Sequence, residues 1–408
     1  MLVWAFDEDV YRDKATGGWL GKNIGGTLGG PVEGRKELLD LTFYPLLPQG
    51  KPLPNDDLDL QLVWLHALEQ YGPGLTAVEL GQEWLEHVRF PYDEYGYALA
   101  NLRRGILPPV SGWFGNPFND CMGAPIRSEV WAMVAPGLPE LAAYYAWNDA
   151  VVDHAGGEGV WGEVLFAAIQ SAAFLESDPR TLIHLGLSFI PAGSRVAKAV
   201  RYLLDLHEKG VPWQEARRRI LQHHGRDNFT DAPQNIAFTL LGWLYGNDFG
   251  DSLLKATNCG YDTHCTAATL GAILGIIHGA DGIPGRWRAP VGDGIVLSPA
   301  IEGIEPPATV QELTERTLAM ARRTVAHWQV PLHIGKGATT IVPGSRPQVR
   351  EPLLAVQQQQ PTSITVPIPH GVVGQPDMRV TVDFGDEGPA IGRCEMRRLE
   401  IALSNLAP

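Results

Sequence analysis

Residues 258–266 are Asn258-Cys259-Gly260-Tyr261-Asp262-Thr263-His264-Cys265-Thr266, and the segment 265–278 continues as CTAATLGAILGIIH. This segment is apolar on nearly every side and rich in alanine and glycine. A helix that is apolar all round is buried at the centre of a helical protein, and small side chains let neighbouring backbones approach closely. The sequence therefore predicts a central helix over 265–278, preceded by a polar turn.

Most of the chain before residue 330 shows the same helical periodicity. Apolar side chains recur at helical spacing in 58–70, 138–151, 160–175, 194–207 and 234–245. Glycine and proline interrupt these runs, as in Tyr71-Gly72-Pro73-Gly74. We therefore predict an all-α fold, a helical bundle that spans residues 1–330.

The composition changes in residues 331–408, which contain many prolines and glycines and four consecutive glutamines. Side chains alternate between polar and apolar in 363–368 and 378–384, a pattern typical of short strands with one buried face. We predict a small β-rich C-terminal region that either caps the helical body or contributes directly to its site.

The bulk composition excludes several classes of protein. The 408 residues carry a formal net charge of −14, which disfavours a nucleic-acid partner because phosphate binding relies on clustered Lys and Arg. The four cysteines match no zinc pattern and no disulfide framework, so reduced thiols are expected. The start lacks the features of a signal peptide, and no apolar run reaches the roughly 18–20 residues of a membrane span. We expect a cytoplasmic protein without a membrane partner; the sequence does not indicate its oligomeric state.

Three polar clusters could carry chemistry. The first is the glycine-rich segment 25–33, read as a loop that follows a helix over 14–24 and ends at Glu33. The second is Asn55-Asp56-Asp57-Leu58-Asp59, in which helix capping explains one or two residues, whereas three carboxylates within four residues favour a divalent cation. The third is the turn with Asp262 and His264, which is either an elaborate cap or a ligand set that faces the second cluster.

Weaker candidates lie between these clusters. Asp149 and Asp153 are four residues apart, as partners on one helix face are, with His154 beside them and Glu158 expected on a loop. Arg127 could clamp a phosphate or pair with Glu129. The aromatic residues Trp113 and Phe114 could stack on a base or a sugar, or simply anchor a loop.

Taken in order, these segments resemble the ADP-ribosylglycohydrolase family, that is, proteins like dinitrogenase reductase-activating glycohydrolase, over roughly residues 10–290. The similar motifs are the early glycine-to-glutamate segment, an acidic triplet that opens a helix, an A-I-R-like segment, and a late N-x-G-G-D-T-D-T-like turn before a small-residue helix. In this chain they are residues 21–33, Asn55-Asp56-Asp57-Leu58, residues 124–127 and residues 258–265.

The resemblance implies an all-α hydrolase with a Mg²⁺ site, and Mn²⁺ or another divalent cation is the alternative, as one ion or two. The implied metal ligands are Asn55, Asp56, Asp57, Asp262, His264 and Cys265, and the implied catalytic residues are Glu33 and Asp56. Substrate-binding residues are expected among Gly29, Trp113, Phe114, Arg127, Asp153, His154, Glu158 and Tyr261.

Three positions depart from the family pattern: Asn55 stands for a threonine, His264 for an aspartate and Cys265 for a threonine. The last two changes offer softer nitrogen and sulfur donors. The resemblance implies hydrolysis of an N- or O-glycosidic bond at the anomeric carbon of ADP-ribose or a related ribosyl group. Two alternatives stay open: a glycosidase for a small nucleoside or pentofuranosyl glycoside, and a catalytically inactive member with a binding or structural role.

Overall fold

Two helices from opposite ends of the chain, α1 (Glu8–Gly29) and α14 (Thr263–His278), pack against each other along their lengths. The computed structural model describes residues 4–330, 332–338, 363–367, 378–383 and 398–403. Around the central pair lie, in chain order, η1 (Gly30–Val32), α2 (Asp56–Tyr71), α3 (Ala77–His87), α4 (Asp93–Arg103), α5 (Val110–Trp113), η2 (Pro125–Arg127), α6 (Glu129–Val134), α7 (Pro139–Ala150), α8 (Glu158–Ala173), α9 (Pro179–Leu187), α10 (Arg195–Glu208), α11 (Trp213–His224), α12 (Ala232–Tyr245), α13 (Phe249–Asn258), α15 (Gly285–Val291) and α16 (Val310–His327).

The predicted all-α fold is confirmed, and the periodic segments correspond to observed helices. The run at 58–70 lies within α2, and the five other predicted runs correspond to α7, α8, α10, α12 and α14 within about two residues at each end. Helix α14 is buried along nearly its whole length, as its composition predicts. Within the described ranges, no helix is both long enough and apolar enough to cross a bilayer.

The prediction of a loop over the glycine-rich segment was wrong, because α1 continues through it to Gly29. The glycines face the backbone of α14: a Cβ atom at Gly25 would lie 2.0 Å from the carbonyl oxygen of Ala267. Glycine within a helix costs roughly 0.5–1 kcal/mol relative to alanine. Here the absence of a side chain permits the close approach of two buried helices, so the glycines serve packing and not a flexible loop.

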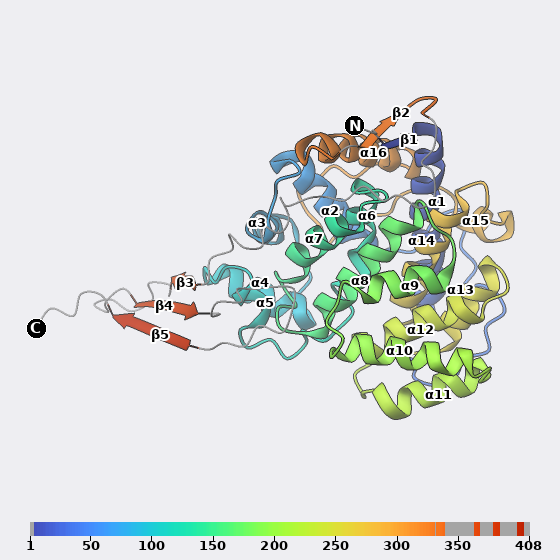
Figure 1. Ribbon diagram of the computed structural model, residues 1–408, viewed down its shortest axis with the longest axis horizontal. Coiled ribbons are helices and arrows are strands. Elements are labelled where there is room, and N and C mark those ends of the chain that lie inside the picture. Colours follow the sequence, from blue (N-terminus) through green and yellow to red (C-terminus); the bar gives the residue numbers. More distant parts are fainter. Residues whose placement is uncertain (1–3, 331, 339–362, 368–377, 384–397, 404–408) are drawn as a thin grey trace, which may run out of the picture.

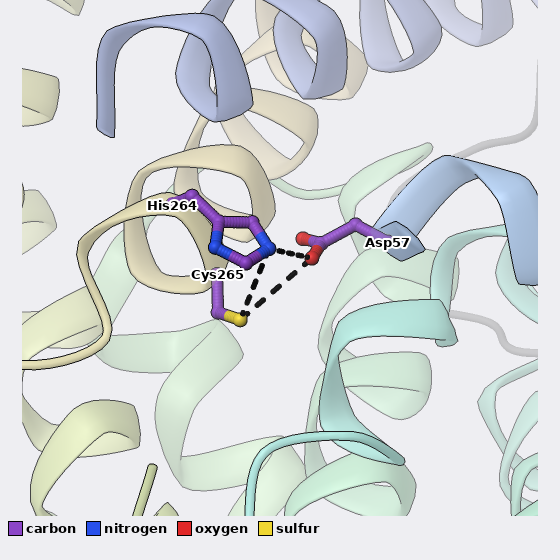
Figure 2. A group of neighbouring side chains, drawn as sticks. All are labelled: Asp57, His264 and Cys265. Atoms are coloured by element: carbon purple, nitrogen blue, oxygen red, sulfur yellow. Dashed lines mark hydrogen bonds and ion pairs between the residues drawn. The ribbon is translucent and has the colours of Figure 1, made fainter. Parts of the chain in front are cut away.

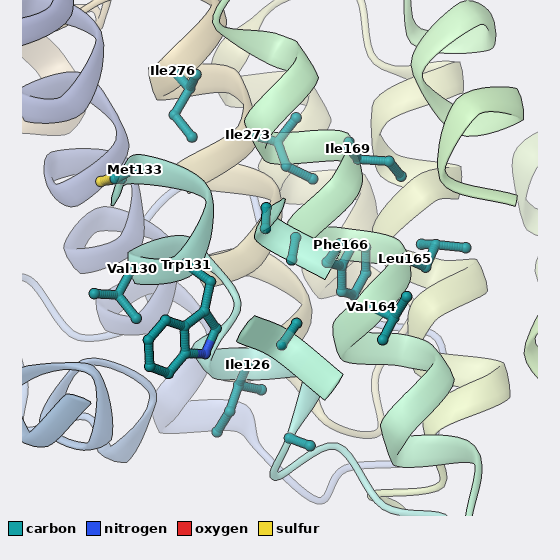
Figure 3. Packing of buried hydrophobic residues seen from close by; sticks show 14 of the residues in the cluster. Ile126, Val130, Trp131, Met133, Val164, Leu165, Phe166, Ile169, Ile273 and Ile276 are labelled. Atoms are coloured by element: carbon teal, nitrogen blue, oxygen red, sulfur yellow. The ribbon is translucent and has the colours of Figure 1, made fainter. Parts of the chain in front are cut away.

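The hydrophobic core is continuous across the helical body. Figure 3 shows Trp131 and Met133 of α6, Phe166 and Ile169 of α8 and Ile273 of α14 within it. The indole nitrogen of Trp131 donates to Asp149 over 2.9 Å, so this large buried ring leaves no polar atom unpaired. The three cysteines in the described ranges, at 121, 259 and 265, are buried and form no disulfide.

Strands form two small sheets. Strand β1 (Trp4–Asp7) pairs in parallel with β2 (Leu332–Gly335), so residues 332–335, expected in the C-terminal region, pair with the start of the chain. In that region, β3 (Ser363–Pro367), β4 (Met378–Asp383) and β5 (Arg398–Leu403) form an antiparallel sheet in the order β3-β4-β5. The alternating runs near 363 and 378 correspond to β3 and β4. Apart from residues 336–338, which follow β2, the other residues of the predicted β-rich region lie outside the described ones.

Candidate metal centre

The first turn of α2 supplies two carboxylates. Asn55 is the N-cap of this helix, and its side-chain oxygen accepts from the backbone N–H of Asp57 over 2.9 Å. Capping therefore explains Asn55, while the next two aspartates project from the first helical turn. Asp56 is partly exposed and Asp57 is completely buried. Asp59 has a different partner from the other two aspartates: its carboxylate accepts from the backbone N–H of Ser298.

The polar turn before α14 is held in place by backbone hydrogen bonds. Tyr261 adopts the left-handed conformation with φ of 66°, and its backbone N–H donates to the carbonyl oxygen of Arg35 over 2.7 Å. The side-chain oxygen of Asn235 accepts from the N–H of Asp262, and the hydroxyl of Thr263 donates to the carbonyl oxygen of Gly29. These bonds place the start of α14 beside the end of α1.

His264 lies at the meeting point of three segments. Its Nε2 atom is 2.9 Å from Oδ1 of Asp57 and 3.2 Å from Oδ1 of Asp56, and its Nδ1 atom is 3.0 Å from Oε2 of Glu33. Figure 2 shows its ring directed at Asp57, with the sulfur of Cys265 below. That sulfur is 3.7 Å from both Asp57 Oδ1 and His264 Nε2. The ends of α1, α2 and α14 thus contribute side chains to one cluster.

A buried lysine that sequence reasoning missed pairs with a carboxylate of this cluster. Lys22 of α1 is completely buried, with its ammonium group 2.9 Å from Oδ2 of Asp57 and 3.2 Å from Oε1 of Glu129. It also donates to the carbonyl oxygen of Ile126, and Glu129 accepts from Gln61. The signal in the sequence was a single charge within the otherwise apolar and glycine-rich stretch 17–30, because such a charge requires a buried partner.

The surroundings shift the pKa values of the clustered groups in opposite directions. Burial alone would raise the pKa of Asp57, but the positive charges of Lys22 and His264 outweigh burial and lower it to about 2. Burial would lower the pKa of His264, yet the negative groups around the ring raise it well above its usual value. The pKa of Asp262 is raised because this carboxyl group is buried. Without a bound cation, the imidazolium of His264 thus neutralises part of the carboxylate charge.

The cluster has the chemical features of a cation site. The ligand atoms of Asp57, His264 and Cys265 lie within 4.8 Å of one another, as do those of Glu33, Asp262 and His264. Among the described residues, no hydrogen-bond donor reaches the buried Oδ1 atom of Asp262, and a buried carboxylate oxygen without a partner is costly. Carboxylate, imidazole and thiol donors together suit a divalent cation that accepts nitrogen and sulfur, such as Zn²⁺, better than Mg²⁺ or Mn²⁺.

Two residues lie where the cluster meets solvent. The side chain of Glu33 is 35% exposed, in contrast to the buried carboxylates behind it. Tyr92, at the N-terminus of α4, is 49% exposed; burial of its hydroxyl raises its pKa, and the charge of nearby Asp56 raises it further. Tyr92, which sequence reasoning did not select, is thus a half-exposed aromatic side chain within electrostatic range of Asp56.

The proposed phosphate clamp at Arg127 is corrected. This side chain is completely buried, with its guanidinium bonded to the carboxylates of Asp149 and Asp153 and to the carbonyl oxygen of Gly123. It also lies over the rings of Trp64 and Trp84, 5.7 and 5.4 Å from their centroids. A group with every donor engaged inside the protein cannot reach a ligand phosphate. The alternative pairing with Glu129 is also wrong, because that carboxylate binds Lys22.

Three more residues that were expected to contact the substrate, Asp153, His154 and Glu158, instead bind other groups of the protein. Asp153 is buried against Arg127 and His154, whose Nδ1 atom is 2.9 Å from Oδ1 of Asp153. Glu158, expected on a loop, begins α8, and its two oxygens accept from the backbone N–H groups of Arg195 and Val196 at 2.8 and 2.9 Å. It thereby caps the start of α10. In the described structure, these carboxylates stabilise helix contacts and do not face the metal-site cluster.

The remaining expected contacts have different environments. Gly29 is the last residue of α1 and lies against the backbone of Thr263, so no space for a ligand lies over it. Tyr261 is half-buried and holds the turn described above, with the guanidinium of Arg217 6.0 Å from its ring centroid. Trp113 and Phe114, at the end of α5, are 48% and 49% exposed and could meet a ligand.

Comparison with known proteins identifies the class. The ADP-ribosylglycohydrolase family model matches residues 7–327, and the chain belongs to this family. An uncharacterized protein of Archaeoglobus fulgidus is 25% identical over 329 residues, which cover 75% of this chain and 96% of that protein. A solved structure described as an ADP-ribosylglycohydrolase-related protein complex has a TM-score of 0.51 at 22% identity, and the match covers 78% of this chain and 99% of that one. The structural match supports the helical fold.

Proposed function

We propose that this protein is a divalent-cation-dependent hydrolase that cleaves an N- or O-glycosidic bond at the anomeric carbon of ADP-ribose or a related ribosyl group. The supporting observation is the position of His264, within 3.2 Å of carboxylate oxygens from Glu33, Asp56 and Asp57. Oxygen and nitrogen donors from three distant segments converge there in a protein of a glycosyl hydrolase family.

Asp57, Asp262, His264 and Cys265 would hold the cation, with Asp56 at its solvent side. A bound cation orients the vicinal hydroxyls of a ribose and lowers the pKa of a coordinated water. To hold the cation, His264 would need to be a neutral imidazole and Cys265 a thiolate. Lys22 keeps its charge beneath Asp57 and fixes the orientation of that carboxylate.

Glu33 is suited to act as the general base. Its carboxylate lies at the solvent side of the cluster, where it can accept a proton from the attacking water and return a proton to the leaving group as the bond between that group and the anomeric carbon breaks. The sugar then passes through an oxocarbenium-like transition state, and the surrounding carboxylates stabilise its positive charge. Tyr92 would offer an aromatic face to the sugar or its substituent.

The burial of Arg127 favours a second candidate substrate. ADP-ribose carries a pyrophosphate, and the arginine expected to bind it is fully engaged with Asp149 and Asp153. A neutral substrate would not need that contact. A small nucleoside or pentofuranosyl glycoside is therefore the alternative substrate for the same centre.

The test is release of free sugar from ADP-ribosyl-arginine, ADP-ribosyl-serine, a nucleoside and a pentofuranoside, each assayed after chelation with Mg²⁺, Mn²⁺ or Zn²⁺ restored. We expect turnover with at least one of these substrates, dependent on the added cation. The Glu33→Gln variant should lose about 10²–10⁴-fold in kcat, the usual contribution of a general base.

Asp227→Asn is the matched control for Asp262→Asn, because Asp227 is an exposed aspartate whose one ion pair within the described part of the chain is with Lys36. Asp262→Asn should abolish turnover and metal binding, while Asp227→Asn should behave as the unaltered protein. Full activity of Asp262→Asn, or cation-independent turnover, would contradict the proposal. Metal binding without turnover of any substrate would instead indicate a binding role.

A further inference from the structure

A second group of metal-ligating side chains lies where α2 and α3 meet, outside the centre described above. Nδ1 of His66 is 2.8 Å from Oε2 of Glu83, and Nε2 of His87 is 3.8 Å from the same oxygen. The ligand atoms of these three residues lie within 4.8 Å of one another. Glu86 adds a further carboxylate oxygen, 3.9 Å from Nε2 of His87.

The orientation of His87 is set from outside this group. Its Nδ1 atom is 2.8 Å from the carbonyl oxygen of Glu302. A carbonyl oxygen can only accept, so Nδ1 carries the proton, and in the neutral ring Nε2 carries a lone pair directed toward Glu83. Histidine ligands of metal ions are oriented in this way, with the second ring nitrogen donating to a backbone carbonyl.

The charge of Glu83 requires a positive partner. Its side chain is 1% exposed, and within the described residues it makes no ion pair with a lysine or arginine. A buried carboxylate needs compensation, and only the two imidazoles are close enough to provide it. The positive charge is therefore either a proton on a histidine or a cation held between the three groups.

We propose that His66, Glu83 and His87 bind a divalent cation of the Zn²⁺ class, with Glu86 as a further oxygen ligand. Two imidazoles and carboxylates suit Zn²⁺, whose nitrogen and oxygen ligands lie about 2.0–2.2 Å from the ion. Donor atoms that lie within 4.8 Å of one another can therefore surround one such ion. The side chain of His66 is 21% exposed and that of Glu86 50%, which leaves a path from solvent.

Such an ion would link three parts of the chain: α2, α3 and the segment at Glu302. Binding only to the folded state stabilises that state by mass action. The site shares no residue with the cluster around His264, and the inference does not depend on the proposed hydrolase activity.

The test measures Zn²⁺ bound per chain by the full-length protein, after chelation and dialysis against Zn²⁺. We expect His66→Gln and His87→Gln each to bind one ion fewer than the unaltered protein and to lose the Zn²⁺-dependent rise in apparent Tm. His207→Gln is the matched control, since this half-buried histidine faces the guanidinium of Arg180 and should bind as many ions as the unaltered protein.

Co²⁺ spectra separate the two sites. Of the two candidate sites, the cluster with Cys265 contains a thiol and the group at His66 does not, so sulfur-to-cobalt charge transfer reports the first centre, whereas the site at His66 contributes only weak visible bands. His66→Gln should remove those bands and leave the charge-transfer band. Loss of the charge-transfer band alone would count against the proposed hydrolase centre and not against this site.

Equal numbers of bound ions in His66→Gln, His87→Gln and the unaltered protein would overturn the inference. If His87→Gln does not fold, shown by its far-ultraviolet circular dichroism, His66→Gln and Glu86→Gln decide, because those side chains are more exposed.

Discussion

Gly21 of α1 and Gly271 of α14 face each other without room for a methyl group. A Cβ atom at Gly21 would lie 1.9 Å from the carbonyl oxygen of Gly271, and one at Gly271 would lie 2.1 Å from that of Gly21. The contact brings the end of α1, and with it Glu33, next to the start of α14, where His264 and Asp262 lie. Helix packing and site assembly are thus linked at this position.

We expect Gly21→Ala to lower the free energy of unfolding by at least about 2 kcal/mol, because overpacking that meets backbone cannot be relieved by a side-chain rotation. Urea denaturation measures the change. Gly193→Ala is the control: nothing lies within 4 Å of its Cβ position, so its stability should change by less than about 0.5 kcal/mol. Equal stability of the two variants would show that the helices can separate without cost.

Lys22→Met should destabilise the protein by about 3–5 kcal/mol, since the substitution removes the positive ammonium group that pairs with the buried carboxylates of Asp57 and Glu129. Lys14→Met on the same helix is the control, because Lys14, as far as the structure describes the chain, bonds to the carbonyl oxygens of Ile276 and Ile277 and to no carboxylate. Denaturant unfolding at neutral pH compares the two. Adding Glu129→Gln to Lys22→Met should restore part of the loss, and no restoration would contradict the charge argument.

The buried pair of His154 and Asp153 predicts a loss of stability at alkaline pH. Burial would lower the pKa of His154, but Asp153 raises it from 6.5 to about 9. The stabilisation is therefore fully present below pH 6.5 and is lost as the pH rises through about 9. At roughly 1.4 kcal/mol per pKa unit it amounts to about 3 kcal/mol.

The measurement is the free energy of unfolding between pH 6 and 10. In the unaltered protein this free energy should fall as the pH rises through about 9, and in His154→Gln that fall should be absent. His223→Gln, at an exposed histidine beside Tyr202, should keep it. An identical decline in His154→Gln would assign the pH dependence to another group.

Cys265→Ser should change which cation the centre prefers. Replacing sulfur by oxygen removes the soft donor, so the affinity for Zn²⁺ should fall at least tenfold relative to that for Mg²⁺. Isothermal titration with each ion measures the two affinities. Cys259→Ser is the matched control, because this buried thiol lies outside the cluster. An unchanged Zn²⁺ to Mg²⁺ ratio in Cys265→Ser would exclude the sulfur as a ligand.

The sequence alone located six of the helices and two polar segments that meet at the site. Helical periodicity is a local property, so α2, α7, α8, α10, α12 and α14 could be located without tertiary contacts. The acidic residues that open α2 and the turn before α14 could be selected because clustered polar groups at a buried helix need partners.

Only the tertiary structure decided what each selected residue contacts. The glycines of α1 suggested a loop, and the approach of α14, more than 230 residues later in the chain, makes them helical. Arg127, Asp153 and Glu158 looked like ligand contacts, yet Arg127 and Asp153 pair with each other and Glu158 caps a helix. Lys22 was missed for the same reason: burial and pairing depend on segments that meet only in the folded chain, and local spacing carries no record of those meetings.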